Sequence, residues 1–144
     1  MEREELLKRE DEAWGAFMEA VAGVPGARRG EPGVVPGWST QDLYWHCGYW
    51  TGYIADTVEG LARGEGMPAD HSDEFWDGAN DAVAREAKWM TWEEIERRSA
   101  QNRARARAGL ESLSEIPAEA AEEFASETFE HYDEHAVEIT KFAG

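Results

Sequence analysis

The stretch that decides the fold runs from Gly37 to His46 and reads GWSTQDLYWH. Its Ser39 and Asp42 form an S-x-x-D start signal, a variant of the capping box with Asp in place of Glu. The helix that begins there is predicted over about 40–63, because apolar side chains recur along one of its faces. This face is expected to be buried, and it includes a histidine. Its residues are Leu43, His46, Trp50, Tyr53, Ile54, Thr57, Val58 and Leu61.

Three further amphipathic helices are predicted, over about residues 2–22, 92–113 and 118–142. Glycines and a proline after residue 63 indicate a loop, and a short helix is expected within 73–88. No alternating strand pattern competes with these helices. The simplest packing of four amphipathic helices is an all-α four-helix bundle. A chain of this length is expected to form a single domain, residues 1–144.

One unusual feature of the helix over 92–113 is that Ser99 and Asn102 lie on its inward face. A bundle core is normally apolar at such positions. The sequence alone does not explain these two polar side chains.

The composition excludes some classes of partner. Acidic residues outnumber basic ones 31 to 14, and the net charge of −17 opposes binding to nucleic-acid phosphates or anionic membranes. The single cysteine, Cys47, rules out an internal disulfide and fits a reducing compartment. No apolar run approaches the roughly 18–20 residues that a membrane span needs. The start of the chain also lacks the form of a secretory signal. We therefore expect a cytoplasmic protein that binds neither nucleic acid nor membrane.

Three of the four histidines predict a metal site. His131 and His135 are four residues apart, so a helix places both imidazoles on one face. His46 is seven positions after its helix start, and His135 is seven positions before Phe142. In antiparallel neighbours, both lie about 10 Å from the same end of the bundle. Three imidazoles leave coordination positions open, which is typical of catalytic metal sites.

Two kinds of chemistry suit such a site, namely activation of a bound thiol and generation of hydroxide from bound water. The pattern from His131 to His135 also matches the H-x-x-E-H motif of inverzincin peptidases. Only nine residues follow His135, so the downstream ligand of those enzymes is missing. Glu134 neighbours His131 at i+3, and it is either a base, a support for a ligand, or a solvated acid of the helix.

Other reactive residues have simpler interpretations. Cys47 is expected to be a small packing residue rather than a nucleophile. His71 is expected to be solvated in the loop, with a movable fourth ligand as the alternative. The only basic cluster is expected to pair with acids on neighbouring helices or across a dimer, and an anionic co-substrate is the alternative. This cluster consists of Arg97, Arg98, Arg103, Arg105 and Arg107.

The order Gly-Trp-Ser-x-x-Asp-x-x-x-His at 37–46, followed by His-x-x-x-His on the last helix, resembles the DinB-like superfamily. That superfamily includes the YfiT-type proteins, the bacillithiol transferases and the mycothiol-dependent maleylpyruvate isomerases. The resemblance implies a four-helix bundle with a long crossover between helices 2 and 3, which would absorb residues 64–90. It also implies a divalent metal, zinc or nickel, held by His46, His131 and His135. Many members are homodimers.

The resemblance favours an enzyme that acts on a small molecule, with S-transfer from a low-molecular-weight thiol at the three-His site. Two alternatives stay open. One is a metal-dependent hydrolase that uses bound water. The other is a non-catalytic bundle that binds a metal or a ligand for sequestration or self-protection.

Overall fold

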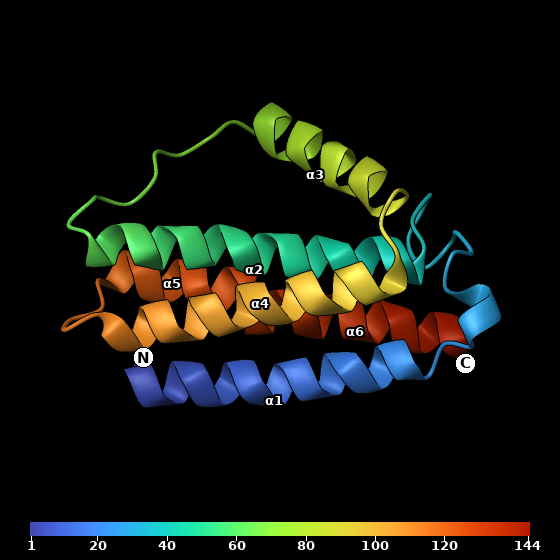
Figure 1. The fold of residues 1–144 in the computed structure, drawn as a ribbon, viewed down its shortest axis with the longest axis horizontal. Helices are drawn as coiled ribbons and strands as arrows, with labels where there is room; N and C mark the ends of the chain where they lie inside the picture. The colour runs from blue at the N-terminus through green and yellow to red at the C-terminus, as the bar shows by residue number, and fades with distance from the viewer.

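The computed structural model describes residues 1–144, and all of its regular structure is helical. Most of the helices lie side by side in a bundle, and one further helix runs outside it (Figure 1). The elements are α1 (Arg3–Ala22), the short 3-10 helix η1 (Gly26–Arg28), α2 (Thr40–Ala62), α3 (Asp73–Ala87), α4 (Trp92–Ser112), α5 (Ala118–Glu127) and α6 (Phe129–Ala143). The four members of the bundle are α1, α2, α4 and the succession of α5 and α6, and α3 is the helix outside it (Figure 1). The predicted all-α bundle is confirmed.

The capping signal predicted before α2 is present. The Asp42 backbone N–H donates to Ser39 Oγ at 3.1 Å, and the Ser39 N–H donates to Asp42 Oδ2 at 2.9 Å. Lys88 Nζ donates to the same carboxylate oxygen at 3.2 Å. Asp42 therefore fixes the start of α2 and ties it to the segment that follows α3.

The connection between α2 and α4 is the long crossover that the resemblance implied. Its helix α3 packs on α2, outside the bundle (Figure 1). The indole Nε1 of Trp50 donates to Asn80 Oδ1 at 2.9 Å. This bond joins α3 to the middle of α2, so the crossover covers one side of that helix. No helix is both long enough and apolar enough to span a membrane.

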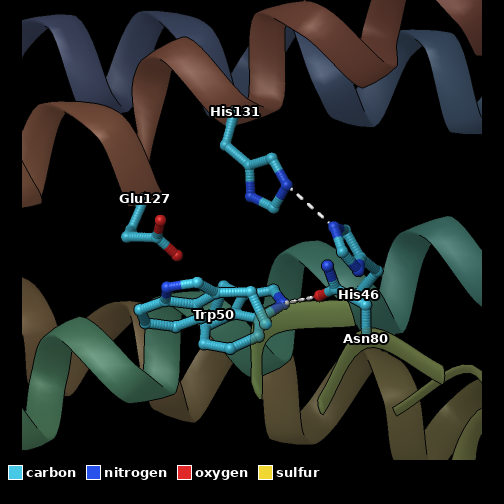
Figure 2. A pocket seen from close by; sticks show the side chains of 6 residues that line it. His46, Trp50, Asn80, Glu127 and His131 are labelled. Atoms are coloured by element: carbon cyan, nitrogen blue, oxygen red, sulfur yellow. Dashed lines mark hydrogen bonds between the residues drawn. The ribbon is translucent and has the colours of Figure 1, made fainter. Parts of the chain in front are cut away.

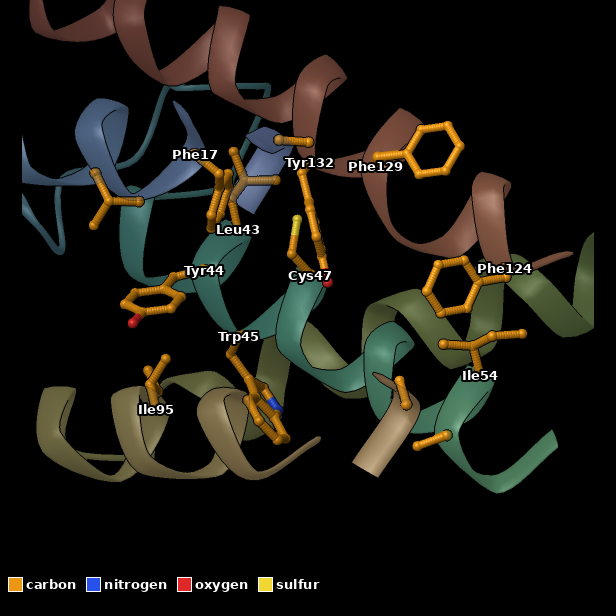
Figure 3. Packing of buried hydrophobic residues seen from close by; sticks show 14 of the residues in the cluster. Phe17, Leu43, Tyr44, Trp45, Cys47, Ile54, Ile95, Phe124, Phe129 and Tyr132 are labelled. Atoms are coloured by element: carbon orange, nitrogen blue, oxygen red, sulfur yellow. The ribbon is translucent and has the colours of Figure 1, made fainter. Parts of the chain in front are cut away.

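The core draws buried side chains from every α-helix, and a group of aromatic rings within it joins α1, α2 and α6. The ring of Phe17 stands 6.0 Å from those of both Tyr44 and Tyr132, measured between centroids. Figure 3 shows these three side chains among the buried residues. Tyr132 is fully buried, and its hydroxyl lies 2.8 Å from Thr51 Oγ1. Tyr132 holds one side of α6 in the core, and the buried His135 follows it by three residues on the adjoining part of the helix surface.

The last predicted helix, 118–142, is interrupted at Thr128, which has φ −116° and ψ −96°. The Thr128 hydroxyl donates to the Phe124 carbonyl at 2.6 Å, and such side-chain bonds compete with regular helical geometry. Residues five apart in an unbroken helix point about 140° away from each other. Phe124 and Phe129 are five residues apart, yet both are buried. This is possible because the interruption at Thr128 reorients α6 relative to α5.

Two glycines of α2 explain the polar residues on the inward face of α4. A Cβ atom added at Gly48 would overlap Ser99 Oγ, and one added at Gly52 would lie 2.6 Å from Asn102 Nδ2. Asn102 Nδ2 donates to the Gly48 carbonyl at 3.0 Å. The two backbones therefore approach closely, and small or hydrogen-bonded side chains are required between them.

Replacing Gly48 or Gly52 with alanine should destabilise the bundle. The added methyl group has no room against α4, and overpacking of this kind costs about 1–3 kcal/mol. The matched control is Gly78→Ala in α3, where nothing lies within 4 Å of the added atom. That change should stabilise the chain by about 0.5–1 kcal/mol, because alanine suits a helix better than glycine. Urea unfolding measures all three, and equal effects at Gly48 and Gly78 would contradict the close approach.

Four of the five arginines in the basic cluster of α4 pair with acids on neighbouring helices, as predicted. Its longest-range contacts join α4 to α1, where Arg103 and Arg107 both bind Glu10. Arg105 binds Asp56 and Glu59 of α2, and Arg98 binds Glu86 of α3. These arginines therefore fasten α4 to three other helices.

Candidate metal centre

Three histidines from two helices converge at one point. His46 lies in the second turn of α2, and His131 and His135 lie in the first two turns of α6. Each offers a ring nitrogen, and these three atoms lie within 4.8 Å of one another. The ring centroids are 4.7 Å apart for His46–His131 and His131–His135, and 5.1 Å apart for His46–His135. The structure thus brings together all three residues that the sequence predicted.

The contacts of the individual ring nitrogens indicate which of them can bind a metal. Nε2 of His46 and Nε2 of His131 lie 2.8 Å apart and face each other in Figure 2. Nδ1 of His135 lies 2.7 Å from Glu138 Oε2, which leaves Nε2 of that ring for a ligand. A carboxylate on the far nitrogen is the usual way of orienting a metal-binding imidazole. Glu138 therefore holds His135 in the orientation that a metal site needs.

Burial keeps two of the rings neutral. Burial lowers the pKa of His46 to about 2, and positive charge on His131 and His135 would lower it in the same direction. The pKa of His131 is lowered to about 3, first by burial and then by His135. Both imidazoles therefore keep free lone pairs at neutral pH. Neutral imidazoles are good ligands for zinc, nickel, copper and iron, so this donor set fits a divalent transition metal.

A pocket of about 200 Å³ opens onto two of the histidines. It is lined by His46, Trp50, Trp76, Asn80, Glu127 and His131. Figure 2 shows the Glu127 carboxylate on the same side of the pocket as His131, with Trp50 opposite. Burial raises the pKa of Glu127 to about 7, with the charge of Glu123 as the second cause. The centre is therefore accessible to a small molecule, beside a carboxyl group that can exchange a proton near neutral pH.

The remaining residues singled out in the sequence lie apart from the three rings. Glu134 is exposed, and the carboxylate that contacts a histidine of the cluster is Glu138 instead. Cys47 is completely buried in the core, which raises the pKa of its thiol. His71 stacks on Phe75 at 3.8 Å between centroids, outside the cluster.

Sequence analysis missed Glu127 and Glu138, although both have a helical signal. Glu127 precedes His131 by four residues, and Glu138 follows His135 by three. Both spacings place side chains on one helical face. Trp76 and Asn80 carried no comparable signal, because they enter the pocket from the crossover helix.

Replacing Glu127 with glutamine should change how stability depends on pH in the metal-free protein. The pKa of Glu127 is raised from 4.5 to about 7 on folding, so the folded state binds this proton more tightly than the unfolded chain. The carboxyl group therefore destabilises the fold increasingly as pH rises from about 4.5 to 7. Glu127→Gln should be more stable than wild type by about 2 kcal/mol above pH 7. This advantage should vanish below about pH 4.5.

Urea unfolding from pH 4 to 8 tests this expectation, with exposed Glu130→Gln as the control. A difference between Glu127→Gln and wild type that is the same at every pH would contradict the raised pKa.

The fold and the site together define a class: a helical-bundle protein with an interior three-histidine cluster that opens onto a pocket. A family model described as the DinB superfamily matches residues 10–138. The chain belongs to the DinB superfamily. No curated protein and no solved structure matches it.

Proposed function

We propose that this chain is a metal-dependent enzyme that acts on a small molecule, with S-transfer from a low-molecular-weight thiol as its reaction. The observation that carries this proposal is the meeting of three imidazoles, two of them neutral through burial, at the wall of a pocket. A structural metal site is closed by four protein ligands, whereas three leave a position for a reactant.

The metal would be held by His46, His131 and His135. A divalent ion there supplies Lewis-acid chemistry that lowers the pKa of a thiol or of water. Zinc and nickel both accept imidazole ligands of this kind. Membership of the DinB superfamily supports both the assignment of zinc or nickel and the proposed Lewis-acid chemistry.

The sulfur would come from a diffusible thiol. Cys47 is the only cysteine of the chain, and it is completely buried, so no protein thiol is available to a substrate. The pocket of about 200 Å³ suits small reactants rather than a polymer. A thiol and a small electrophile are therefore the reactants that fit.

Glu127 lies where it could act as the general base and acid of the reaction. Its carboxylate lines the same pocket as His46 and His131, and its pKa near 7 suits a group that accepts and returns a proton at neutral pH. In thiol transfer it would take the proton as the S–H bond breaks and the sulfur forms its bond to an electrophilic carbon, and it would return that proton to the group that leaves the same carbon. Trp50 and Trp76 form an apolar wall that limits the access of water.

Turnover assays separate this function from its alternatives. Zinc- or nickel-loaded protein is mixed with N-acetylcysteine and a model electrophile, and thiol consumption is compared with that of a His46→Ala/His131→Ala/His135→Ala variant. We expect metal-dependent consumption that falls at least about a hundredfold in that variant, and about as far in Glu127→Gln. Turnover of an ester without added thiol would favour a hydrolase. No turnover above the triple variant with either substrate would favour a non-catalytic binding protein.

A further inference from the structure

The crossover helix α3 contributes one amide side chain to the pocket at the histidines. Asn80 lines that pocket together with His46, His131 and Glu127. Its side chain is half-buried and forms one hydrogen bond, in which Oδ1 accepts from the indole N–H of Trp50 at 2.9 Å. Neither metal binding nor the proton transfer at Glu127 uses this amide.

The bond to Trp50 determines which end of the amide faces the pocket. An indole N–H donates and cannot accept a hydrogen bond. The oxygen of Asn80 must therefore face Trp50, and the nitrogen must point away from it. In Figure 2 the amide oxygen lies on the dashed bond to Trp50, and the nitrogen points up towards the part of the pocket below His131. Nδ2 thus offers the pocket a donor that no protein atom accepts.

Several contacts hold Asn80 in this position. Trp76, one helical turn before it, packs against Trp50 with 5.3 Å between the ring centroids. One turn after it, Val83 and Ala84 are buried. A donor that is already fixed before the reaction needs no reorganisation when charge develops on its acceptor. Asn80 therefore has the form of a preorganised donor.

The charges around Asn80 favour an uncharged acceptor. No lysine or arginine lines the pocket, and Glu127 is the one acidic side chain there. A carboxylate of a ligand at Asn80 would have no protein cation beside it, and juxtaposed like charges are costly. A carbonyl oxygen accepts from a neutral amide N–H without needing a counter-charge. The nitrogen of Asn80 therefore suits a carbonyl group.

The presence of two separate polar groups indicates which carbon of the electrophile is attacked. When a thiol displaces a group from a saturated carbon, negative charge develops on the leaving group alone, and Glu127 can return the proton there. At an acyl carbon, charge also develops on the carbonyl oxygen, which then needs a donor of its own. Glu127 and Asn80 come from different helices, α5 and α3, so they can serve two different atoms.

We propose that the electrophile is an acyl compound, an ester or a thioester, whose carbonyl oxygen accepts a hydrogen bond from Asn80 Nδ2. As the sulfur of the thiol forms a bond to the acyl carbon, the S–H bond breaks and its proton passes to Glu127. The π electrons of the carbonyl group move onto its oxygen, where the Asn80 N–H stabilises the negative charge.

The second half of the step restores the carbonyl group. The oxygen returns its electron pair to the acyl carbon, the bond from that carbon to the leaving group breaks, and the leaving group takes the proton from Glu127. The products are a thioester of the added thiol and a free alcohol or thiol. This inference rests on the proposed function for the added thiol and for the role of Glu127.

A comparison of two electrophiles tests the catalytic part of the proposal. Phenyl acetate offers an acyl carbon, and benzyl chloride offers a saturated one. Each is mixed with N-acetylcysteine and zinc-loaded protein. We expect Asn80→Ala and Asn80→Asp to lower the turnover of phenyl acetate by about a hundredfold relative to that of benzyl chloride. Exposed Asp81→Ala, the matched control on α3, should leave both rates unchanged.

The aspartate variant separates a donor from a structural residue. Asn80→Asp keeps an oxygen that accepts from Trp50, so it preserves the contact between α3 and α2, but it replaces the N–H donor with an acceptor. A purely structural role would therefore spare this variant. Wild-type turnover of phenyl acetate in Asn80→Asp, equal losses with both electrophiles, or turnover of benzyl chloride alone would overturn the proposal.

A binding measurement tests the contact without any reaction. Acetophenone and ethylbenzene have similar shapes, but only acetophenone has a carbonyl oxygen. In the ¹⁵N-labelled chain, metal-free and zinc-loaded, acetophenone should shift the side-chain amide resonance of Asn80 saturably, and ethylbenzene should not. No saturable shift, or the same shift with both, would overturn the proposal. If acetophenone shifts the resonance but neither electrophile consumes thiol, the thiol-transfer function is wrong and the carbonyl contact of Asn80 stands.

Discussion

Replacing His131 with alanine should abolish stoichiometric metal binding, and replacing His46 should do the same. The two Nε2 atoms lie 2.8 Å apart, so each variant removes one of three converging ligands. The remaining two would hold a divalent ion far more weakly, because catalytic zinc sites need three protein ligands. Elemental analysis after zinc or nickel loading and desalting should give about one equivalent for wild type and almost none for either variant.

The chain offers an internal control in its fourth histidine. His71 stacks on Phe75 outside the cluster, so His71→Ala should retain the metal content of wild type. If His46→Ala and His131→Ala carry as much metal as wild type, the three-histidine assignment is wrong. If His71→Ala loses its metal, His71 takes part in the site as the movable ligand that its sequence position allowed.

Replacing Glu10 with alanine should be the most destabilising change to a charged residue. Glu10 is 1% exposed, and it receives Nε and Nη2 of Arg103 at 2.7 and 3.0 Å and Nη1 of Arg107 at 2.7 Å. Its loss leaves two half-buried guanidinium groups without their shared partner. Breaking a buried pair from one side costs about 3–5 kcal/mol. The midpoint of thermal unfolding should fall by roughly 10 °C.

Asp11 is the matched control for this prediction. It also binds Arg103, at 2.6 Å, but its side chain is 69% exposed. Surface ion pairs contribute less than about 1 kcal/mol, so Asp11→Asn should have a small effect. Equal losses of stability in Glu10→Ala and Asp11→Asn, measured by urea unfolding, would show that burial does not set the energy of this ion pair.

The helices and the three histidines could be predicted because local rules fix them. Ser39 and Asp42 mark the start of α2 through their side-chain chemistry, and the spacing of His131 and His135 requires one helical face. The depth of His46 along the bundle, which matches that of His135, followed from counting residues along antiparallel helices. None of these inferences depends on the rotation of each helix about its own axis, which decides the side that the helix turns towards its neighbours.

The details that escaped prediction depend on that rotation. Glu134 and Glu138 each lie three residues after a histidine, so spacing alone does not choose between them. The choice follows from the direction of α6, which is set by the buried ring of Tyr132 and the interruption at Thr128. A threonine inside an amphipathic pattern gives little warning of such an interruption.

The close approach of α2 and α4 escaped for a related reason. Ser99 and Asn102 look misplaced until Gly48 and Gly52 are seen opposite them. Pairing residues across helices requires the register of the two helices, which no local pattern supplies. The polar positions of α4 are therefore consequences of tertiary packing.

A crystal structure of the zinc-loaded protein, with anomalous diffraction recorded at the zinc edge, tests the central claim most directly. We expect one anomalous peak, from a zinc ion held by ring nitrogens of His46, His131 and His135, with its remaining coordination open to the pocket that contains Glu127. A peak elsewhere, or a fourth protein ligand that closes the site, would contradict it.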